Sequence, residues 1–174
     1  KKNYPEQNVL NWAPSIMFRY MFNKQHVLMF RYRGRSSTPN IEDLQEVIDI
    51  TDPMNMRYGN PNLKPSFNNS FTLDYRKFVP EAMRSYSANL YYTNTLNSVA
   101  NKMTYDPETG ARVYKKENVN GNWQARGYFS FNTPLKNKKF TISSNTNARY
   151  SDAVSYTSVG NNRNLDQELS TTHN

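Results

Sequence analysis

The sequence predicts an all-β protein built from antiparallel strands, and three observations support this class. Six segments alternate between apolar and polar residues with a period of two, which fits the two faces of a strand and not the 3.6-residue period of a helix. The connections between these segments alternate between short polar turns and long polar loops. Aromatic residues make up 14% of the chain, and this content with regular alternation argues against disorder.

The first two segments are predicted to form a hairpin around the turn Asn23-Lys24-Gln25. Leu10 to Phe22 aligns its large apolar residues on one face: Leu10, Trp12, Ile16, Phe18, Tyr20 and Phe22. His26 to Arg35 places Leu28, Phe30 and Tyr32 opposite Arg31, Arg33 and Arg35.

A long connection, Ser36 to Pro65, follows and contains the signals of a short helix. Thr38 is the predicted N-cap, Pro39 occupies the first helical position, and Glu42 and Asp43 lie in the first turn. Four apolar residues recur at helical spacing, and we expect the helix to end before Asp52-Pro53: Ile41, Leu44, Val47 and Ile48.

The next two segments, Phe67 to Phe78 and Arg84 to Leu96, are joined by a short stretch around Pro80-Glu81. Phe67, Phe71, Leu73 and Tyr75 share one face of the first of them. The second segment repeats the scheme, although Tyr91 falls on its polar face.

The connection from Asn97 to about Gly121 holds the turn signal Asp106 to Gly110, so the flanking strands are expected to extend well beyond their neighbours as a protruding hairpin. Gln124 to Asn132 and Phe140 to Tyr150 are the last predicted strands, joined by a turn at Thr133 to Asn137. Tyr128 falls on the polar face of the former. Everything after Ser151 is expected to be a long connection, which leaves room for at most one or two further strands.

These features together predict an antiparallel meander that forms part of a transmembrane β-barrel of a Gram-negative outer membrane, with turns periplasmic and loops extracellular. Val and Ile are few, whereas Tyr, Phe, Asn, Ser and Thr are abundant, as lipid-facing girdles and a wet lumen require. Mean hydropathy is −0.91, and no apolar run approaches the roughly 20 residues of a membrane helix. A soluble β-sandwich binding module is the alternative. The predicted membrane-interface aromatics are Trp12, Tyr20, Tyr32, Tyr75 and Tyr150.

The chain has a net charge of +8. Six of its arginines fall at the alternate strand positions that would face the barrel interior: Arg19, Arg31, Arg33, Arg76, Arg126 and Arg149. One interpretation is that they line and hydrate a lumen and pair with acids from a plug or from further strands. The other is a site for anionic solutes centred on Arg31, Arg33 and Arg35. Nucleic acid is not an expected partner.

One stretch of the first long loop resembles a known family. Arg57 to Pro65, which includes Gly59-Asn60-Pro61-Asn62-Leu63-Lys64-Pro65, is similar to the segment that precedes a barrel strand in TonB-dependent outer-membrane receptors. Asp49 to Pro53, Asn118 to Asn122 and Phe131 to Leu135 resemble the related outer-membrane β-barrel family of Bacteroidetes. Ser66 departs from the receptor pattern, which commonly has Glu there. Tyr58, Asn60 and Asn62 are candidate ligand contacts at the lumen mouth, with a structural loop role as the alternative.

The resemblance implies uptake of a large solute, energised by a TonB-type protein through a plug that this chain does not contain. The competing function is a non-transporting barrel that serves as a scaffold or binds surface partners, such as a surface lipoprotein or another component of an outer-membrane assembly. Bacterial barrels begin at about eight strands, so six predicted strands make residues 1–174 a partial barrel domain. Outer-membrane lipid would surround it.

Catalytic and metal-binding constellations are not found in the sequence. The chain has no cysteine, and its two histidines, His26 and His173, lie far apart. No phosphate loop, nucleophile motif or calcium loop is present, and Asp106 to Gly110 is more simply a turn. The sequence therefore predicts no enzymatic activity, no catalytic residue, no metal and no cofactor.

Overall fold

The computed structural model describes residues 11–46, 49, 51–135, 139–157 and 160–173, and over 155–157 and 160–173 it describes the backbone alone. Several residues used above lie outside the described residues: Leu10, Val47, Ile48, Lys136 and Asn137.

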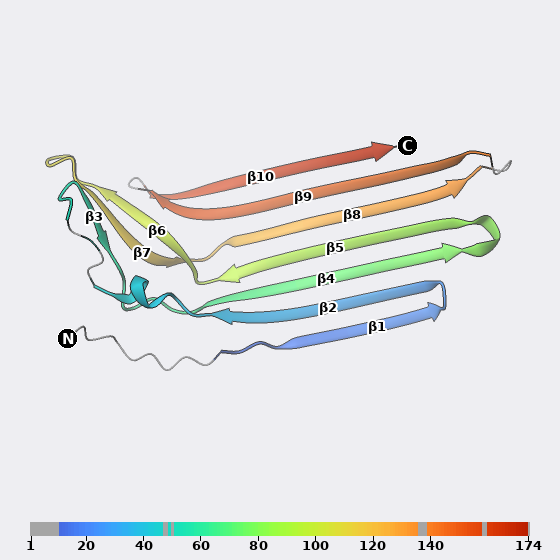
Figure 1. Ribbon diagram of the computed structural model, residues 1–174, viewed down its shortest axis with the longest axis horizontal. Helices are drawn as coiled ribbons and strands as arrows, with labels where there is room; N and C mark the ends of the chain where they lie inside the picture. The colour runs from blue at the N-terminus through green and yellow to red at the C-terminus, as the bar shows by residue number, and fades with distance from the viewer. Residues whose placement is uncertain (1–10, 47–48, 50, 136–138, 158–159, 174) are drawn as a thin grey trace.

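Seven strands form one continuous antiparallel sheet, called the main sheet below (Figure 1). Its order across the sheet is β1-β2-β4-β5-β8-β9-β10, a meander in which every neighbouring pair is antiparallel. The strands are β1 (Ser15–Asn23), β2 (His26–Ser37), β4 (Ser66–Val79), β5 (Arg84–Leu96), β8 (Asn122–Pro134), β9 (Thr141–Thr157) and β10 (Gly160–His173). All six predicted strands form, although β1 begins at Ser15, so that residues 11–14 of the first predicted segment precede it. The predicted all-β meander is confirmed.

Register across the main sheet separates two faces. One row joins Phe18, Phe30, Leu73, Leu90, Gly127 and Ala148, and the next row joins Met17, Arg31, Thr72, Tyr91, Arg126 and Arg149. Because successive side chains point to opposite sides of a strand, these rows lie on opposite faces. We call the first the aromatic face and the second the polar face.

The main sheet has no core of its own among the described residues. Their buried apolar side chains are Leu44, Leu63, Ala111 and Val119, which lie in or next to the loop elements described below. By contrast, Phe18 and Leu90 on the aromatic face are more than half exposed. An aromatic face without protein cover fits a sheet that is solvated by lipid on that side.

A second sheet of three strands lies beyond the end of the main sheet opposite the short turns (Figure 1). It consists of β3 (Asn55–Tyr58), β7 (Arg112–Val119) and β6 (Ser98–Tyr105), with β3 parallel to β7 and β7 antiparallel to β6. The predicted protruding hairpin is β6–β7. Asn97 (φ 51°) and Gly121 (φ 109°) mark the positions where this hairpin departs from β5 and β8.

The tip of the hairpin is a turn at Asp106 to Gly110, as predicted. The Gly110 amide donates to the Asp106 carbonyl at 2.8 Å, and Gly110 has φ +74°, which a glycine adopts without strain. The Asp106 carboxylate accepts hydrogen bonds from the Thr109 hydroxyl and the Glu108 amide, and these bonds lower its pKa.

Two predictions about the connections are wrong in detail. The loop helix is a 3-10 turn, Ile41–Leu44, whose N-cap is Asn40 and not Thr38, and it makes no side-chain capping bond. Burial of Leu44 takes precedence over the local capping signals. The region after Ser151 is not a loop throughout, because β9 continues to Thr157 and β10 runs to His173. β10 is one further strand, within the one or two that the sequence left open.

The first long loop folds back onto itself at Gly59. A Cβ added at Gly59 would lie 2.1 Å from the Gln45 carbonyl oxygen and 2.5 Å from that of Asp43. The neighbouring Asn60 amide donates to the same Asp43 carbonyl at 2.7 Å. Only glycine fits where two backbone segments approach this closely.

Gly59→Ala is therefore expected to open this loop, at a cost of about 1–3 kcal/mol or more, because the atoms that clash belong to the backbone and cannot turn aside. Hydrogen exchange on the natural polypeptide in detergent should show faster exchange at the Asn60 and Arg57 amides, while the main sheet stays protected. Gly127→Ala is the matched control, since its Cβ would meet Leu90 at an ordinary 3.4 Å. Unchanged exchange in Gly59→Ala would contradict the packing described here.

Thr109→Val should raise the pKa of Asp106 toward its ordinary value of 3.8, because the Thr109 hydroxyl is the largest cause of the lowering. A carboxyl group with a lowered folded pKa stabilises the fold above its unfolded pKa and loses that effect as pH falls through the folded pKa. The native tip should therefore hold at neutral pH and loosen only in acid below 3.8. Carboxyl-carbon NMR titration measures the pKa of Asp106, with Thr104→Val as the control. The same Asp106 pKa in Thr109→Val and in the natural protein would refute the role of the Thr109 hydroxyl.

Candidate functional site

The three arginines predicted to be central lie side by side on the polar face of β2. Arg31, Arg33 and Arg35 are in register with Thr72, Ser70 and Asn68 of β4. Arg33 and Arg35 are exposed and Arg31 is half-buried, with one guanidinium nitrogen 3.8 Å from the Met29 sulfur. Neither the Lys102–Glu117 nor the Lys116–Asp43 ion pair involves these three arginines.

Further arginines share this face. Arg126 of β8 and Arg149 of β9 are direct register partners, and Arg19 and Arg76 lie nearer the short turns. Asp74 is the acid on this face of β1 to β9, and it accepts a 2.6 Å hydrogen bond from the Asn89 amide. Backbone register also sets Glu168 of β10 opposite Arg149. The face thus carries an excess of positive charge.

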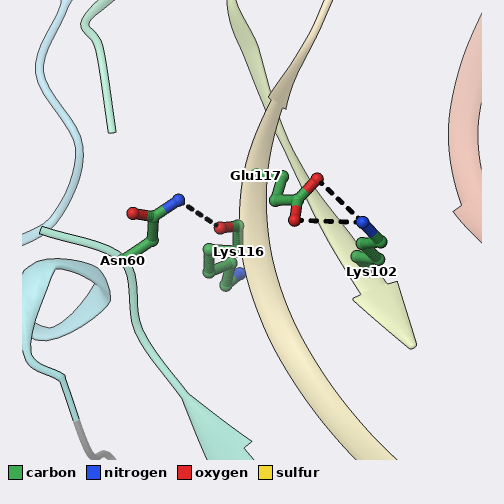
Figure 2. A network of polar contacts seen from close by, with 4 residues as sticks. All are labelled: Asn60, Lys102, Lys116 and Glu117. Atoms are coloured by element: carbon green, nitrogen blue, oxygen red, sulfur yellow. Dashed lines mark hydrogen bonds and ion pairs between the residues drawn. The ribbon is translucent and has the colours of Figure 1, made fainter. Parts of the chain in front are cut away.

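The predicted contacts Tyr58, Asn60 and Asn62 lie on the loop at the β3 end of the structure. The Asn60 side chain donates to the Lys116 carbonyl at 3.0 Å, as Figure 2 shows, and its Oδ1 accepts from the Asn62 amide at 3.0 Å. The Tyr58 hydroxyl lies 3.6 Å from the Met56 sulfur. No hydrogen bond or ion pair among the described residues joins this group to the three β2 arginines, and contact with a ligand stays a prediction for both.

Asn118 has a structural role that the sequence interpretation missed. Its Oδ1 accepts from the Lys64 amide at 2.8 Å, while its Nδ2 donates to the Lys64 carbonyl at 3.0 Å and the Asn97 carbonyl at 2.8 Å. The Asn97 amide in turn donates to Asn120 Oδ1 at 2.7 Å. Asn118 lies in the segment Asn118 to Asn122, whose resemblance to the Bacteroidetes barrel family was the one sequence signal that could have pointed to this role. We call the bonds made by Asn60 and Asn118 the loop clamp.

Ion pairs reinforce the loop clamp. The Lys116 ammonium lies 3.8 Å from an Asp43 carboxylate oxygen, which joins β7 to the 3-10 turn. Lys102 and Glu117 pair at 3.2 Å across β6 and β7 (Figure 2). Both pairs are partly exposed, so each contributes at most about 1 kcal/mol. The side-chain to backbone bonds of the clamp carry most of the constraint.

Aromatic residues form a continuous ladder across five strands near the loop end. Tyr32, Phe71, Tyr92, Trp123 and Tyr150 have successive ring centroids 5.0, 6.1, 5.9 and 4.9 Å apart. Such contacts add roughly 0.5–1.5 kcal/mol each beyond burial. Trp123 was not among the predicted belt residues, because its place in the row depends on strand register.

A second aromatic group lies at the turn end of the aromatic face. Phe22 and His26 stack at 4.1 Å, and Tyr75 meets His26 edge to face at 5.2 Å. Predicted Tyr20 contacts Phe22 at 4.7 Å, whereas predicted Trp12 precedes β1 and is exposed. Tyr32 follows His26 by six residue steps along β2, which is about 20 Å at about 3.4 Å per residue. This approaches the apolar band of about 25 Å between the two girdles of an outer-membrane barrel.

The described residues offer neither a metal site nor a membrane-spanning helix. Among the described residues, no three His, Cys, Asp or Glu side chains come together in a way that would hold a metal ion. Over the same part of the chain, no helix has the length and apolar character needed to cross a membrane. The expectations of no metal, no cofactor and no enzymatic activity stay predictions.

Comparison with known proteins identifies one family. The model of the outer membrane protein β-barrel family matches residues 1–174. No curated protein and no solved structure matches the chain. The family match agrees with the antiparallel meander, its two faces and its two aromatic groups, and it places the protein in the outer membrane of a Gram-negative bacterium. The chain therefore belongs to the outer membrane protein β-barrel family.

Proposed function

We propose that this chain is the barrel segment of a TonB-dependent receptor that takes up a large solute. The observation that carries the proposal is an apolar patch on the polar face, at the turn end. The residues of this turn-end patch are Met17, Met21, Val27, Met29 and Phe78.

The turn-end patch needs a protein cover. Met17, Met21 and Phe78 are exposed over 65%, 61% and 46% of their surfaces. A cavity of about 540 Å³ borders it, lined by apolar and charged side chains together: Arg19, Lys24, Gln25, Val27, Met29, Asp74, Arg76 and Phe78. Methionines exposed to a water-filled lumen would leave apolar surface in contact with water. A folded domain inside the barrel, with an apolar surface against the methionines and acidic groups near Arg19 and Arg76, would bury them.

The opposite end of the barrel supports the same function. The loop clamp holds the first long loop against the β6–β7 hairpin, and this gives a fixed surface outside the membrane. A large solute binding such a preformed surface loses less entropy than it would on mobile loops. Under this proposal the domain covering the turn-end patch is the plug, and a TonB-type protein pulls on it from the periplasm.

The proposal includes the remaining expectations for this protein. Residues 1–174 form part of a barrel completed by further strands, and the organism belongs to the Bacteroidetes. The protein has no enzymatic activity and no cofactor. Its partners are outer-membrane lipid, the energy-coupling protein and a surface lipoprotein or other assembly component, and nucleic acid is not among them.

A non-transporting scaffold is the second candidate, and one observation favours it. Ile41, Met54 and Tyr105 lie in or near the second, three-stranded sheet and are exposed over 64%, 48% and 48% of their surfaces. Exposed apolar side chains outside the membrane are what a surface partner would cover. A scaffold does not require a covered lumen, so the state of the turn-end patch separates the two functions.

The turn-end patch is expected to be shielded in the natural polypeptide. Because the chain has no cysteine, Met29→Cys gives a single labelling site on the patch. A bulky PEG-maleimide should label it slowly in the protein extracted in detergent, since a plug would exclude the reagent. Thr109→Cys at the exposed hairpin tip is the control and should be labelled rapidly.

Energy coupling can be tested with the same variants in intact cells. Labelling of Met29→Cys should rise when the inner-membrane proton gradient is present and fall when the gradient is collapsed, while Thr109→Cys stays constant. Rapid labelling of Met29→Cys in the detergent-extracted protein would rule out a plug and favour the scaffold.

A further inference from the structure

Two tyrosines break the alternation of the main sheet, and the structure places them next to each other. Tyr91 of β5 is the register partner of Arg126, and Tyr128 of β8 is the register partner of Asn89. The two rings are therefore diagonal neighbours on the polar face, a spacing of about 7–8 Å that large side chains can bridge. Besides this pair, the rows of Tyr91 and Tyr128 carry Met17 and Met29 on the far strands β1 and β2, while their nearer neighbours Thr72, Asp74, Asn89 and Arg126 are polar.

Arg126 and Arg149 lie beside this pair. As direct register partners on β8 and β9, their Cα atoms are about 4.5–5.5 Å apart, and both side chains are exposed. Like charges placed directly opposite each other destabilise a sheet. Arginine, however, is suited to oxyanions, because its guanidinium donates two parallel hydrogen bonds.

A cavity joins Tyr128 of the pair to the two arginines. It has a volume of about 320 Å³, and its side-chain lining is Arg126, Tyr128, Arg149, Asn89 and Asn147. This volume lies at the lower end of small-molecule sites, which measure about 300–1,000 Å³. The Tyr128 hydroxyl donates to Asn145 at 3.2 Å, which fixes the ring, and Asn89 is fixed by its bond to Asp74. The walls of the cavity are thus preorganised.

The nearby acids do not cancel this positive charge. Asp74 is two strands from Arg126 and is engaged by Asn89. Glu168 is the register partner of Arg149, which leaves Arg126 between Tyr91 and Arg149 in its row. Backbone register also sets Asp166 of β10 opposite Ser151 on the same face, but like Glu168 it is two strands from Arg126. No acid therefore pairs directly with Arg126 in the register of β5, β8 and β9.

We propose that this cavity binds the oxyanion of a ring-bearing solute, with the carboxylate, sulfate or phosphate group on Arg126 and Arg149 and the ring on Tyr128. The amides of Asn89 and Asn147 are placed to bond further polar groups of the solute. The inference rests on the proposed uptake function in that it names the class of solute, but binding itself requires no energy coupling.

Calorimetry on the natural polypeptide in detergent tests the site with three probes: phenyl phosphate, inorganic phosphate and phenol. Phenyl phosphate should bind best, because it alone supplies both the ring and the anion. Arg126→Gln should weaken phenyl phosphate and inorganic phosphate about tenfold or more, the effect of one charge-assisted hydrogen bond. Tyr128→Leu should weaken phenyl phosphate and leave inorganic phosphate unchanged.

Arg84→Gln is the matched control. Arg84 lies at the turn end, where it bonds the Thr133 hydroxyl at 3.0 Å, and its loss should leave binding of all three probes unchanged. Far-UV circular dichroism confirms that each variant keeps its sheet. No binding of phenyl phosphate, or equal binding by Arg126→Gln and the natural protein, would overturn the site. A shielded turn-end patch without anion binding refutes this inference alone, whereas anion binding with an unshielded patch refutes the plug alone.

Discussion

The register of the antiparallel main sheet is the constraint on which the rest of the structure depends. Pairing Phe30 with Leu73 and Leu73 with Leu90 fixes both faces at once, because side chains alternate along every strand. A slip of one residue between β2 and β4 would turn Arg31 and Arg33 toward lipid, where an arginine costs about 2–4 kcal/mol at the membrane midplane. The ladder from Tyr32 to Tyr150 opposes the same slip from the other face. The lipid surface and the lumen are therefore two results of one set of backbone bonds.

The strands of the main sheet were largely predictable because their signal is local. A period of two is present within each segment, so β4 and β5 were found within a residue or two of their ends. The parallel pairing of β3 with β7 was not predictable, since it joins Asn55 to Arg112 through contacts far apart in the chain. The capping signals at Thr38 and Pro39 failed for a related reason, because Leu44 is buried and the loop turns back at Gly59 against the backbone of Asp43 and Gln45.

The candidate sites divide in the same way. The inward parity of the β2 arginines followed from alternation alone, and register now aligns them with β4. The role of Asn118 did not follow, because its partners are backbone groups of Lys64 and Asn97 that only the folded loops bring to it. Tyr91 and Tyr128 were visible as exceptions to the pattern, but their adjacency depends on how β5 pairs with β8. Sequence periodicity thus assigns a face to a residue, and register assigns its neighbours.

The polar face changes character along the barrel, and this bears on where opening would take place. Its loop end is held by the loop clamp, in which Asn60 and Asn118 bond backbone groups of separate loops. Its turn end presents methionines and Phe78, with no comparable side-chain to backbone network among the described residues. Apolar contacts are non-directional, so a partner can separate from them without leaving unpaired polar groups. Breaking the loop clamp, by contrast, would leave several hydrogen-bond donors and acceptors without partners. Under the proposed uptake function, a pull from the periplasm would therefore separate the cover from the turn-end patch while the mouth keeps its shape. A solute held at Arg126 and Arg149 would lie in the register row of Met17, at the edge of that patch.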